Sequence, residues 1–277
     1  MIQDVRNTQG VLADMIHELH LETSRVKYIA QADYDDVKNL TNKLYELRER
    51  ASYKKAFEGK PLISIRIATY NRADTLINTA IASVLKQTYQ NFEIVIVGDH
   101  CTDDTEEKLA KLKDKRIRFY NLPNRTVYPE NSVLKWRVIG TPAMNLAANM
   151  AKGEWIAPLD DDDEFTPDHL EKLIDKAKAT KSEMVYGAMI QKNLVTGKEK
   201  KLWSSPPRAG EFSFHNAIYM KLLNEIFKYD FKTWVMDEVN DWNMCRRMME
   251  SGVKISAIED VVGTANMIPP GHEVKDY

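Results

Sequence analysis

Four consecutive carboxylates, Asp160–Asp163, are the residues of this 277-residue chain that most clearly indicate a chemical role. A run of like charges repels itself unless cations or solvent screen it, and taken alone it is typical of a solvated acidic loop. Here an apolar segment, WIAPL, leads directly into the run, and Thr166 and Pro167 follow as the expected cap and first turn of a helix. Carboxylate oxygens at such a junction suit Mg²⁺ or Mn²⁺. We therefore predict a metal site there.

Two other polar segments also follow apolar, β-branched runs. Thr69-Tyr70-Asn71-Arg72 comes after residues 62–68, and Gly98 to Thr105 comes after residues 92–97. Strands at 62–68, 92–97, 117–120 and 155–159 alternate with helices predicted at 73–86, 105–113 and 142–152. This alternation predicts an α/β fold with a Rossmann-like, mostly parallel central sheet. Such sheets bind ligands at the carboxyl ends of their strands, so the three polar segments should meet.

We expect the α/β domain to span residues 61–263 and to be followed by a tail at 264–277. A hairpin around Thr196-Gly197, a helix at 240–251 ended by Gly252 and a last strand at 253–258 complete it. Residues 1–58 contain no proline and predict a helical extension. Its apolar residues recur in alternating four- and three-residue steps: Leu12, Ile16, Leu19, Val26, Ala30, Val37, Leu40, Leu44, Leu47 and Ala51. This spacing favours equally a two-stranded coiled coil and helices folded back on the domain.

Composition excludes some classes of function. The formal net charge of -2 gives no basic domain for nucleic acid. Cys101 and Cys245 stand apart, as free thiols of a reducing compartment do. The first residues do not form a signal peptide, and no apolar run reaches the ~18 residues that a membrane span needs. We expect a cytoplasmic protein, which can still lie at the membrane periphery.

From about Pro61 to Gly252 the chain resembles the inverting family 2 glycosyltransferases, which have the GT-A fold. Three motifs carry the resemblance: the T-Y-N-R turn at Thr69 to Arg72, the Asp99 turn with Cys101-Thr102-Asp103-Asp104-Thr105, and the L-D-x-D-D…P pattern from Leu159 to Pro167. Each is modest alone, but the three in order at successive strand ends are specific. The resemblance implies transfer of a sugar from a nucleotide-diphosphate donor to an acceptor hydroxyl, with Mn²⁺ or Mg²⁺.

The resemblance also implies roles for single residues. The Thr69–Asn71 turn and Asp99 would hold the nucleotide base, with Asp99 accepting from a base N–H. Asp160 would reach the ribose or the metal, and Asp162 would ligate the metal between the phosphates. The nucleotide-sugar set as a whole is Thr69, Tyr70, Asn71, Arg72, Asp99, Asp160 and Asp161.

The general base of such an inverting transfer would be Asp241, near the start of a late helix. An Asp at that place also stabilises a helix dipole, and Asp237 and Glu238 are alternative bases. The chain departs from the family where Asn240 replaces a Glu and where Met144 replaces an Arg. We hypothesise that Arg125 or Arg137 takes the place of that Arg.

Other candidates stay open at this stage. His100 can be a polar loop residue, His215 can face the acceptor or the core, and His272 is a candidate further metal ligand. The family's commonest donor is a UDP-sugar, with a saccharide or lipid-linked acceptor in polysaccharide or glycoconjugate synthesis. One alternative is a sugar nucleotidyltransferase, which needs a Gly-rich loop where Thr69–Arg72 stands. Another is a non-catalytic nucleotide-sugar-binding scaffold whose N-terminal helices join it to a partner. Independently of that alternative, the N-terminal helices are also where we expect a homodimer to form.

Overall fold

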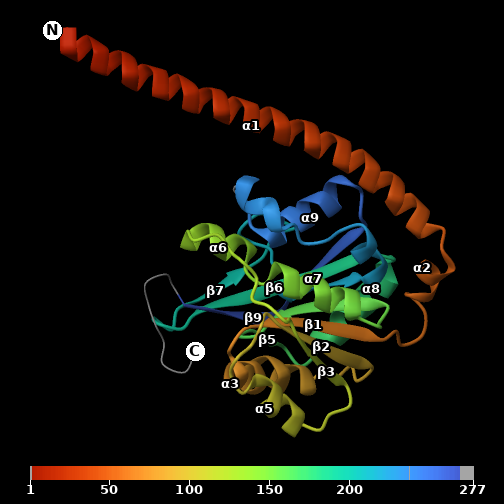
Figure 1. Ribbon diagram of the computed structural model, residues 1–277. Helices are drawn as coiled ribbons and strands as arrows, with labels where there is room; N and C mark the ends of the chain where they lie inside the picture. The colour runs from red at the N-terminus through yellow and green to blue at the C-terminus, as the bar shows by residue number, and fades with distance from the viewer. Residues whose placement is uncertain (1, 237, 269–277) are drawn as a thin grey trace.

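A nine-stranded mixed sheet flanked by helices forms the body of the protein, and one long helix projects from it (Figure 1). The structure is a computed structural model that describes residues 2–236 and 238–268, without the side chains of residues 2–10, 27–35 and 234–236. Its strands are β1 (Ile63–Thr69), β2 (Phe92–Gly98), β3 (Ile117–Asn121), β4 (Trp155–Asp160), β5 (Glu164–Phe165), β6 (Met184–Asn193), β7 (Glu199–Leu202), β8 (Ala217–Met220) and β9 (Ile255–Met267).

The helices lie mostly between the strands in sequence. The α-helices are α1 (Ile2–Arg48), α2 (Ala51–Lys55), α3 (Ala73–Thr75), α4 (Ala82–Leu85), α5 (Thr105–Lys111), α6 (Ser132–Val138), α7 (Thr141–Met150), α8 (His169–Thr180) and α9 (Asn240–Glu250). A π-helical turn, η1 (Leu76–Ile81), joins α3 to α4, and η2 (Phe214–Asn216), η3 (Lys221–Glu225) and η4 (Phe231–Met236) are 3₁₀ turns.

The predicted parallel core of the sheet is confirmed. The strand order is β3-β2-β1-β4-β8-β6-β9-β5, with β7 paired to β6. β3, β2, β1 and β4 are mutually parallel, and β8 is the antiparallel strand between β4 and β6. In this register Ala68 of β1 lies beside Asp160 of β4, and Thr69 lies beside Gly98 of β2. The three polar segments predicted to meet therefore leave the sheet side by side.

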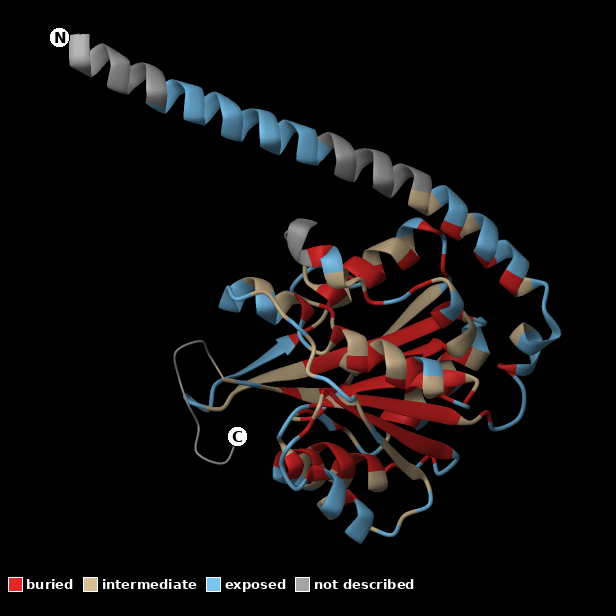
Figure 2. Ribbon diagram, viewed as in Figure 1, coloured by how far each residue is buried: buried red, intermediate tan, exposed pale blue. Residues whose placement is uncertain are grey.

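Alternation along the central strands gives the sheet two apolar faces. Ile63, Ile65 and Ile67 belong to the larger core, which also contains α8 residues. Val95 and Val97 point to the other face and pack against α7. Burial of each such side chain contributes ~1.5–3 kcal/mol. Strands buried on both faces hold the loops at their carboxyl ends in place (Figure 2).

The long helix α1 divides into two stretches with different surroundings. Near its end, Leu40, Leu44 and Leu47 are at most 3% exposed and pack against the domain. Farther out, apolar residues of the same repeat are more than half exposed, with Leu19 at 72% (Figures 1 and 2). The end of the single helix α1 therefore packs on the domain, rather than two helices folding back on it, whereas the described residues leave the apolar seam of its projecting part uncovered.

An ion pair fixes the junction between this helix and the sheet. Arg48 donates through Nε and Nη2 to the two oxygens of the fully buried Glu183, at 2.6 and 2.8 Å. Tyr53 also donates to Glu183, at 2.9 Å. Bidentate arginine–carboxylate pairs are among the stronger charge-assisted hydrogen bonds. Residues 40–57 thus share the core of the domain that was predicted to begin at residue 61.

Some local predictions differ from the structure. Thr166 is not the cap of the next helix, because α8 begins at His169 after Asp168 and the Thr166 hydroxyl donates to Asp168 at 2.8 Å. The last strand continues to Met267, because β9 pairs with β6 both before and after a register irregularity near Ala188, up to the pair Asn193–Met267. Thr264 to Met267 therefore belong to the sheet, although they were assigned to the tail. Across the described residues, no helix has both the length and the apolarity to cross a bilayer.

Candidate active site

The carboxyl ends of β1, β2 and β4 converge, as predicted, into one polar site. The Thr69 hydroxyl at the end of β1 donates to Asp161 Oδ2 at 2.6 Å, which ties the first turn to the acidic loop. Gly98 allows the close approach on the β2 side, since a Cβ there would lie 2.6 Å from Asn121 Oδ1. Without that glycine the β2 turn could not sit so close to β3.

Asn71 is the link between the first two turns. Its backbone is left-handed, with φ of 51°. The side-chain oxygen accepts from the Thr102 N–H at 2.8 Å, and the amide donates back to the Thr102 hydroxyl at 3.2 Å. This reciprocal pair makes Asn71 a brace for the turn in which Tyr70 and Arg72 stand.

Asp99 is buried and already accepts hydrogen bonds from the loop after β3. Its Oδ1 accepts from the Thr126 N–H and hydroxyl, at 3.1 and 2.7 Å, and its Oδ2 accepts from Arg125 and from Tyr128. The Arg125 guanidinium also lies 3.4 Å from the centre of the Tyr70 ring. Two residues predicted to hold the nucleotide base therefore both contact Arg125. A base N–H can bind Asp99 only if one of these donors moves.

Arg72 neutralises part of the acidic loop. Its Nη1 lies 2.7 Å from Asp162 Oδ2 and 3.3 Å from Asp161 Oδ1. Burial, followed by the charge of Asp162, raises the pKa of Asp161 to about 7, and burial raises the pKa of Asp162 despite the pair with Arg72. Holding the loop fully ionised thus costs free energy, which a bound cation would offset. The hard oxygen donors and this surplus of negative charge fit Mg²⁺ or Mn²⁺.

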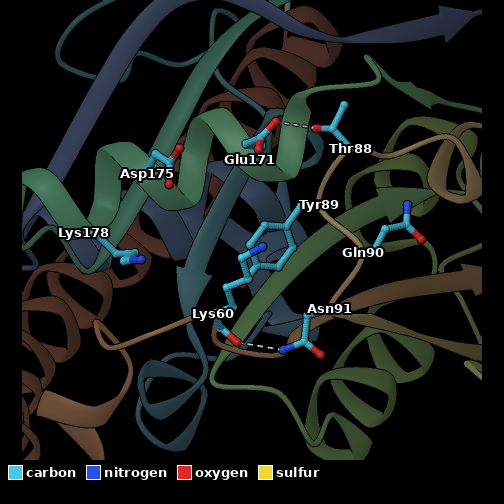
Figure 3. Close-up of a pocket in the computed structure, with 8 residues that line it drawn as sticks. All are labelled: Lys60, Thr88, Tyr89, Gln90, Asn91, Glu171, Asp175 and Lys178. Carbon is cyan, nitrogen blue, oxygen red and sulfur yellow. Dashed lines mark hydrogen bonds between the residues drawn. The ribbon is translucent and has the colours of Figure 1, made fainter.

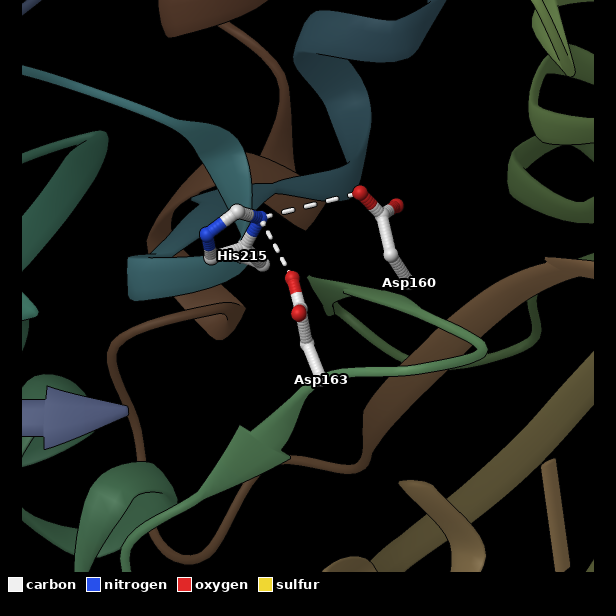
Figure 4. A group of neighbouring side chains, drawn as sticks. All are labelled: Asp160, Asp163 and His215. Carbon is white, nitrogen blue, oxygen red and sulfur yellow. Dashed lines mark ion pairs between the residues drawn. The ribbon is translucent and has the colours of Figure 1, made fainter. Parts of the chain in front are cut away.

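A second cluster includes two other carboxylates of the same loop. Asp160, Asp163 and His215 place their ligand atoms within 4.8 Å of one another (Figure 4). His215 Nδ1 is 3.2 Å from Asp163 Oδ2 and 3.7 Å from Asp160 Oδ2. Burial alone would lower the pKa of His215, but Asp163 and then Asp160 raise it to about 9. The site thus contains a histidine that sequence analysis left between the acceptor side and the core.

Asp241 stands in the first turn of α9, as predicted, and contacts the turn that carries His215. Its Oδ2 accepts from the Ser213 hydroxyl at 2.8 Å and from the Phe214 N–H at 3.2 Å. Within the described residues, Oδ1 has no hydrogen-bond partner. One oxygen is thus held in place and the other can accept a proton. Glu238, an alternative base, is engaged instead by Arg246 and Asn243.

Arg66 is a site residue that sequence analysis missed. It lies on β1, is 1% exposed, and donates to the Tyr229 hydroxyl at 2.5 Å. Its Nη1 is 3.8 Å from Asp160 Oδ1, and neither Nε nor Nη1 has a hydrogen-bond partner among the described residues. A charged residue within the apolar run LISIRIA was the available signal, because unpaired charge is rarely buried in a central strand without a role.

The remaining candidates contribute less to the centre. His100, in the turn after β2, contacts the Leu122 carbonyl, and Arg137 lies on α6. Asp237 and His272 lie outside the described residues. A hollow on the surface lies elsewhere, at the amino ends of β1 and β2. It is lined in part by Lys60 and Asn91, and by Glu171, Asp175 and Lys178 of α8 (Figure 3). It is separate from the loops at the carboxyl ends.

Curated relatives match about half of the chain. A glucosyltransferase of Escherichia coli, named UDP-Glc:alpha-D-GlcNAc-diphosphoundecaprenol beta-1,3-glucosyltransferase WfaP, is 37% identical over 148 residues, which are 53% of this chain and 52% of that protein. The putative colanic acid biosynthesis glycosyl transferase WcaA of Escherichia coli K12 is 35% identical over 139 residues, 49% of this chain and 43% of that protein. The chain spans about half the length of the curated relatives that it matches.

Solved structures share the fold at low identity. S. aureus TarS 1-349 in complex with UDP-GlcNAc superposes with a TM-score of 0.60 and 19% identity, covering 76% of this chain and 60% of that one. The mannosyltransferase PcManGT of Pyrobaculum calidifontis, in complex with GDP-Man and Mn²⁺, has a TM-score of 0.56 and 14% identity, covering 86% and 69%. These likenesses confirm the expected GT-A fold.

The family itself follows from a match along the sequence. The family model described as "Glycosyl transferase family 2" matches residues 64–249, which is more than half of the chain. The matched segment includes β1, β2 and β4, the acidic loop and Asp241. The chain therefore belongs to glycosyl transferase family 2.

Proposed function

We propose that this protein is an inverting glycosyltransferase that transfers a sugar from a UDP-linked donor to an acceptor hydroxyl in the synthesis of a polysaccharide or glycoconjugate. The observation that carries the proposal is the convergence of the acidic loop, the Asp99 turn and Asp241 within a family 2 domain. A UDP donor is supported by the UDP-Glc in the name of WfaP and the UDP-GlcNAc bound by TarS.

The nucleotide-sugar would lie over the carboxyl ends of β1, β2 and β4. Thr69, Tyr70, Asn71 and Arg72 would line one side, and Asp160 and Asp161 the other. Asp99 would accept a hydrogen bond from the base after one donor of the Arg125 loop has moved away from it. Arg125 would then turn towards the phosphates. The ring of Tyr70 is 40% exposed, which is consistent with stacking on a ligand.

The acidic loop would hold a divalent ion, Mn²⁺ or Mg²⁺. Asp162 would become a ligand once Arg72 is released from it. The ion would offset the negative charge that builds on the departing diphosphate. Arg72 would then be free to pair with a phosphate oxygen, for which a guanidinium is well suited.

Asp241 would be the general base. Its Oδ1 would take the proton from the acceptor hydroxyl as that oxygen attacks the anomeric carbon and the bond to the diphosphate breaks. Ser213 and the Phe214 N–H keep the carboxylate oriented by donating to Oδ2. This arrangement favours an enzyme over a non-catalytic scaffold, since a binding protein has no need of an oriented, half-open carboxylate.

The acceptor is proposed to be a saccharide or lipid-linked saccharide, and the protein to act in the cytoplasm at the membrane periphery. The diphosphoundecaprenol in the name of WfaP supports this class. The exposed apolar seam of α1, at Leu12, Ile16, Leu19 and Val26, would pair with a second copy of the chain as a coiled coil. The full chain and a chain with residues 1–26 removed would be compared by sedimentation. A monomeric mass for both would end the dimer proposal.

Calorimetric titration tests the donor and the metal together. UDP, GDP and dTDP are titrated with and without Mn²⁺ into the wild type and Asp162→Ala. The expected result is tight, Mn²⁺-dependent binding of UDP that the variant loses. Asp168→Ala, in the turn before α8, is the matched control and should bind as the wild type does. No binding of any nucleotide in either condition would contradict the glycosyltransferase assignment.

A further inference from the structure

The cluster of Asp160, Asp163 and His215 differs from the acidic loop in that its third donor is a nitrogen. His215 comes from the 3₁₀ turn η2, whereas both carboxylates come from the loop after β4 (Figure 4). We propose that Asp160, Asp163 and His215 Nδ1 ligate the divalent ion of this enzyme in addition to Asp162, which gives the site a mixed oxygen and nitrogen ligand set. The inference deepens the proposed function and rests on it.

The distances between the donor atoms suit a shared ion. Two ligand atoms at about 2.1 Å from one metal are ~3.0 Å apart at right angles and ~3.6 Å apart at 120°. The Nδ1 atom of His215 lies 3.2 Å from one carboxylate oxygen and 3.7 Å from the other.

Each ligand is also oriented by a second group that leaves the proposed donor atom facing the centre. Asp163 Oδ1 accepts from the Asn266 N–H at 2.8 Å, so Oδ2 points towards His215. Asp160 Oδ1 faces Arg66 Nη1 at 3.8 Å, and Oδ2 faces His215. Outer contacts of this kind are what hold first ligands in metal sites.

The imidazole is held from behind as well. Its Nε2 lies 3.0 Å from the sulfur of Met189 on β6, which directs Nδ1 into the cluster. The Ser213 hydroxyl lies 3.1 Å from Nδ1 and also donates to Asp241. The proposed histidine ligand and the proposed base are therefore linked through a single hydroxyl, so that metal binding and base orientation would depend on the same short turn.

A nitrogen ligand changes which metal the site prefers. Carboxylates and water suit Mg²⁺ and Mn²⁺ alike, but imidazole favours first-row transition ions. Mg²⁺ also demands near-ideal octahedral oxygen geometry. The proposed set therefore predicts at least about tenfold tighter binding of Mn²⁺ than of Mg²⁺.

Pulsed EPR of bound Mn²⁺ tests the ligand directly, without any measurement of activity. Mn²⁺ is added to the full chain with and without UDP, and electron spin echo modulation reports directly bound nitrogen. We expect ¹⁴N modulation in the wild type, replaced by the ¹⁵N pattern when histidine is ¹⁵N-labelled. In His215→Gln the modulation should disappear and Mn²⁺ affinity should fall by at least about tenfold.

Ser213→Ala is the matched control, since it removes the neighbouring hydroxyl but keeps the imidazole; its ¹⁴N modulation should persist. Absence of ¹⁴N modulation in the wild type, its persistence in His215→Gln, or failure of the wild type to bind Mn²⁺ in either condition would overturn the proposal. The labelling arm needs no substitution, so a poorly folded variant cannot obscure the answer. Calorimetric UDP binding, which is measured separately, shows whether the proposed donor site fails instead.

Discussion

Replacement of Asp241 by Asn is expected to remove catalysis while leaving fold and donor binding intact. The two groups that hold the side chain, the Ser213 hydroxyl and the Phe214 N–H, both donate to Oδ2. In Asp241→Asn these donors select the orientation in which the amide oxygen takes the place of Oδ2. The amide NH₂ then occupies the position of Oδ1, and it cannot accept a proton.

The magnitude follows from that geometry. General base catalysis contributes about 10²–10⁴ in rate, so kcat should fall by that factor, which corresponds to about 2.7–5.5 kcal/mol in the activation barrier. Because both hydrogen bonds to the amide oxygen are kept, the free energy of unfolding should change by less than about 1 kcal/mol. Donor affinity should change by less than about twofold, since the altered atom faces the acceptor.

The assay is release of UDP from the donor that calorimetry identifies, measured with the wild-type acceptor and in single turnover. Glu238→Gln is the matched control. Glu238 is engaged by Arg246 and Asn243, so its loss should cost about 1–3 kcal/mol of stability rather than kcat. A kcat of Asp241→Asn within tenfold of the wild type would refute the assignment, as would a loss that appears wholly in donor affinity. A collapse of kcat in Glu238→Gln alone would transfer the role to Glu238.

Three further outcomes follow from buried groups. Arg66→Met should be neutral or stabilising by about 1–3 kcal/mol in urea unfolding, because two guanidinium nitrogens have no hydrogen-bond partner among the described residues, yet it should lower kcat by removing the ion-pair partner of Asp160; a large loss of stability would contradict this. Leu44→Ala should cost about 2–5 kcal/mol in the same measurement, whereas Leu19→Ala, at an exposed site on the same helix, should stay within about 0.5 kcal/mol. Burial lowers the pKa of His169 to about 3, so its ring should show no NMR titration between pH 8 and 5, and stability should fall below pH 6.5 by up to about 1.4 kcal/mol per pH unit, because the unfolded chain gains a proton that the folded one refuses.

The sequence predicted well those features that depend on the local pattern of apolar and polar residues. The parallel strands, the positions of the three polar segments and the place of Asp241 at the start of a helix all follow from periodicity and from the family motifs. Short-range pattern could not give β8, whose place between β4 and β6 depends on long-range pairing. Nor could it separate the two stretches of α1, because one heptad repeat passes through both, and only packing decides which leucines are covered.

The charge balance of the site is the part that sequence reasoning missed, and the reason is physical. The acidic loop is a single contiguous run, so its carboxylates are visible in the sequence, whereas the cations that face it come from separate strands and turns. Arg72 follows β1, Arg66 lies within β1, and His215 arrives from η2. At each of these contacts, a metal ion can take the place of the cationic side chain, or a phosphate can take the place of the carboxylate. We therefore expect donor and ion to enter by exchanging partners with Arg72, rather than by filling a site that lacks contacts. A fall in the salt dependence of Mn²⁺ and UDP binding in Arg72→Gln would support that exchange, and unchanged salt dependence would contradict it.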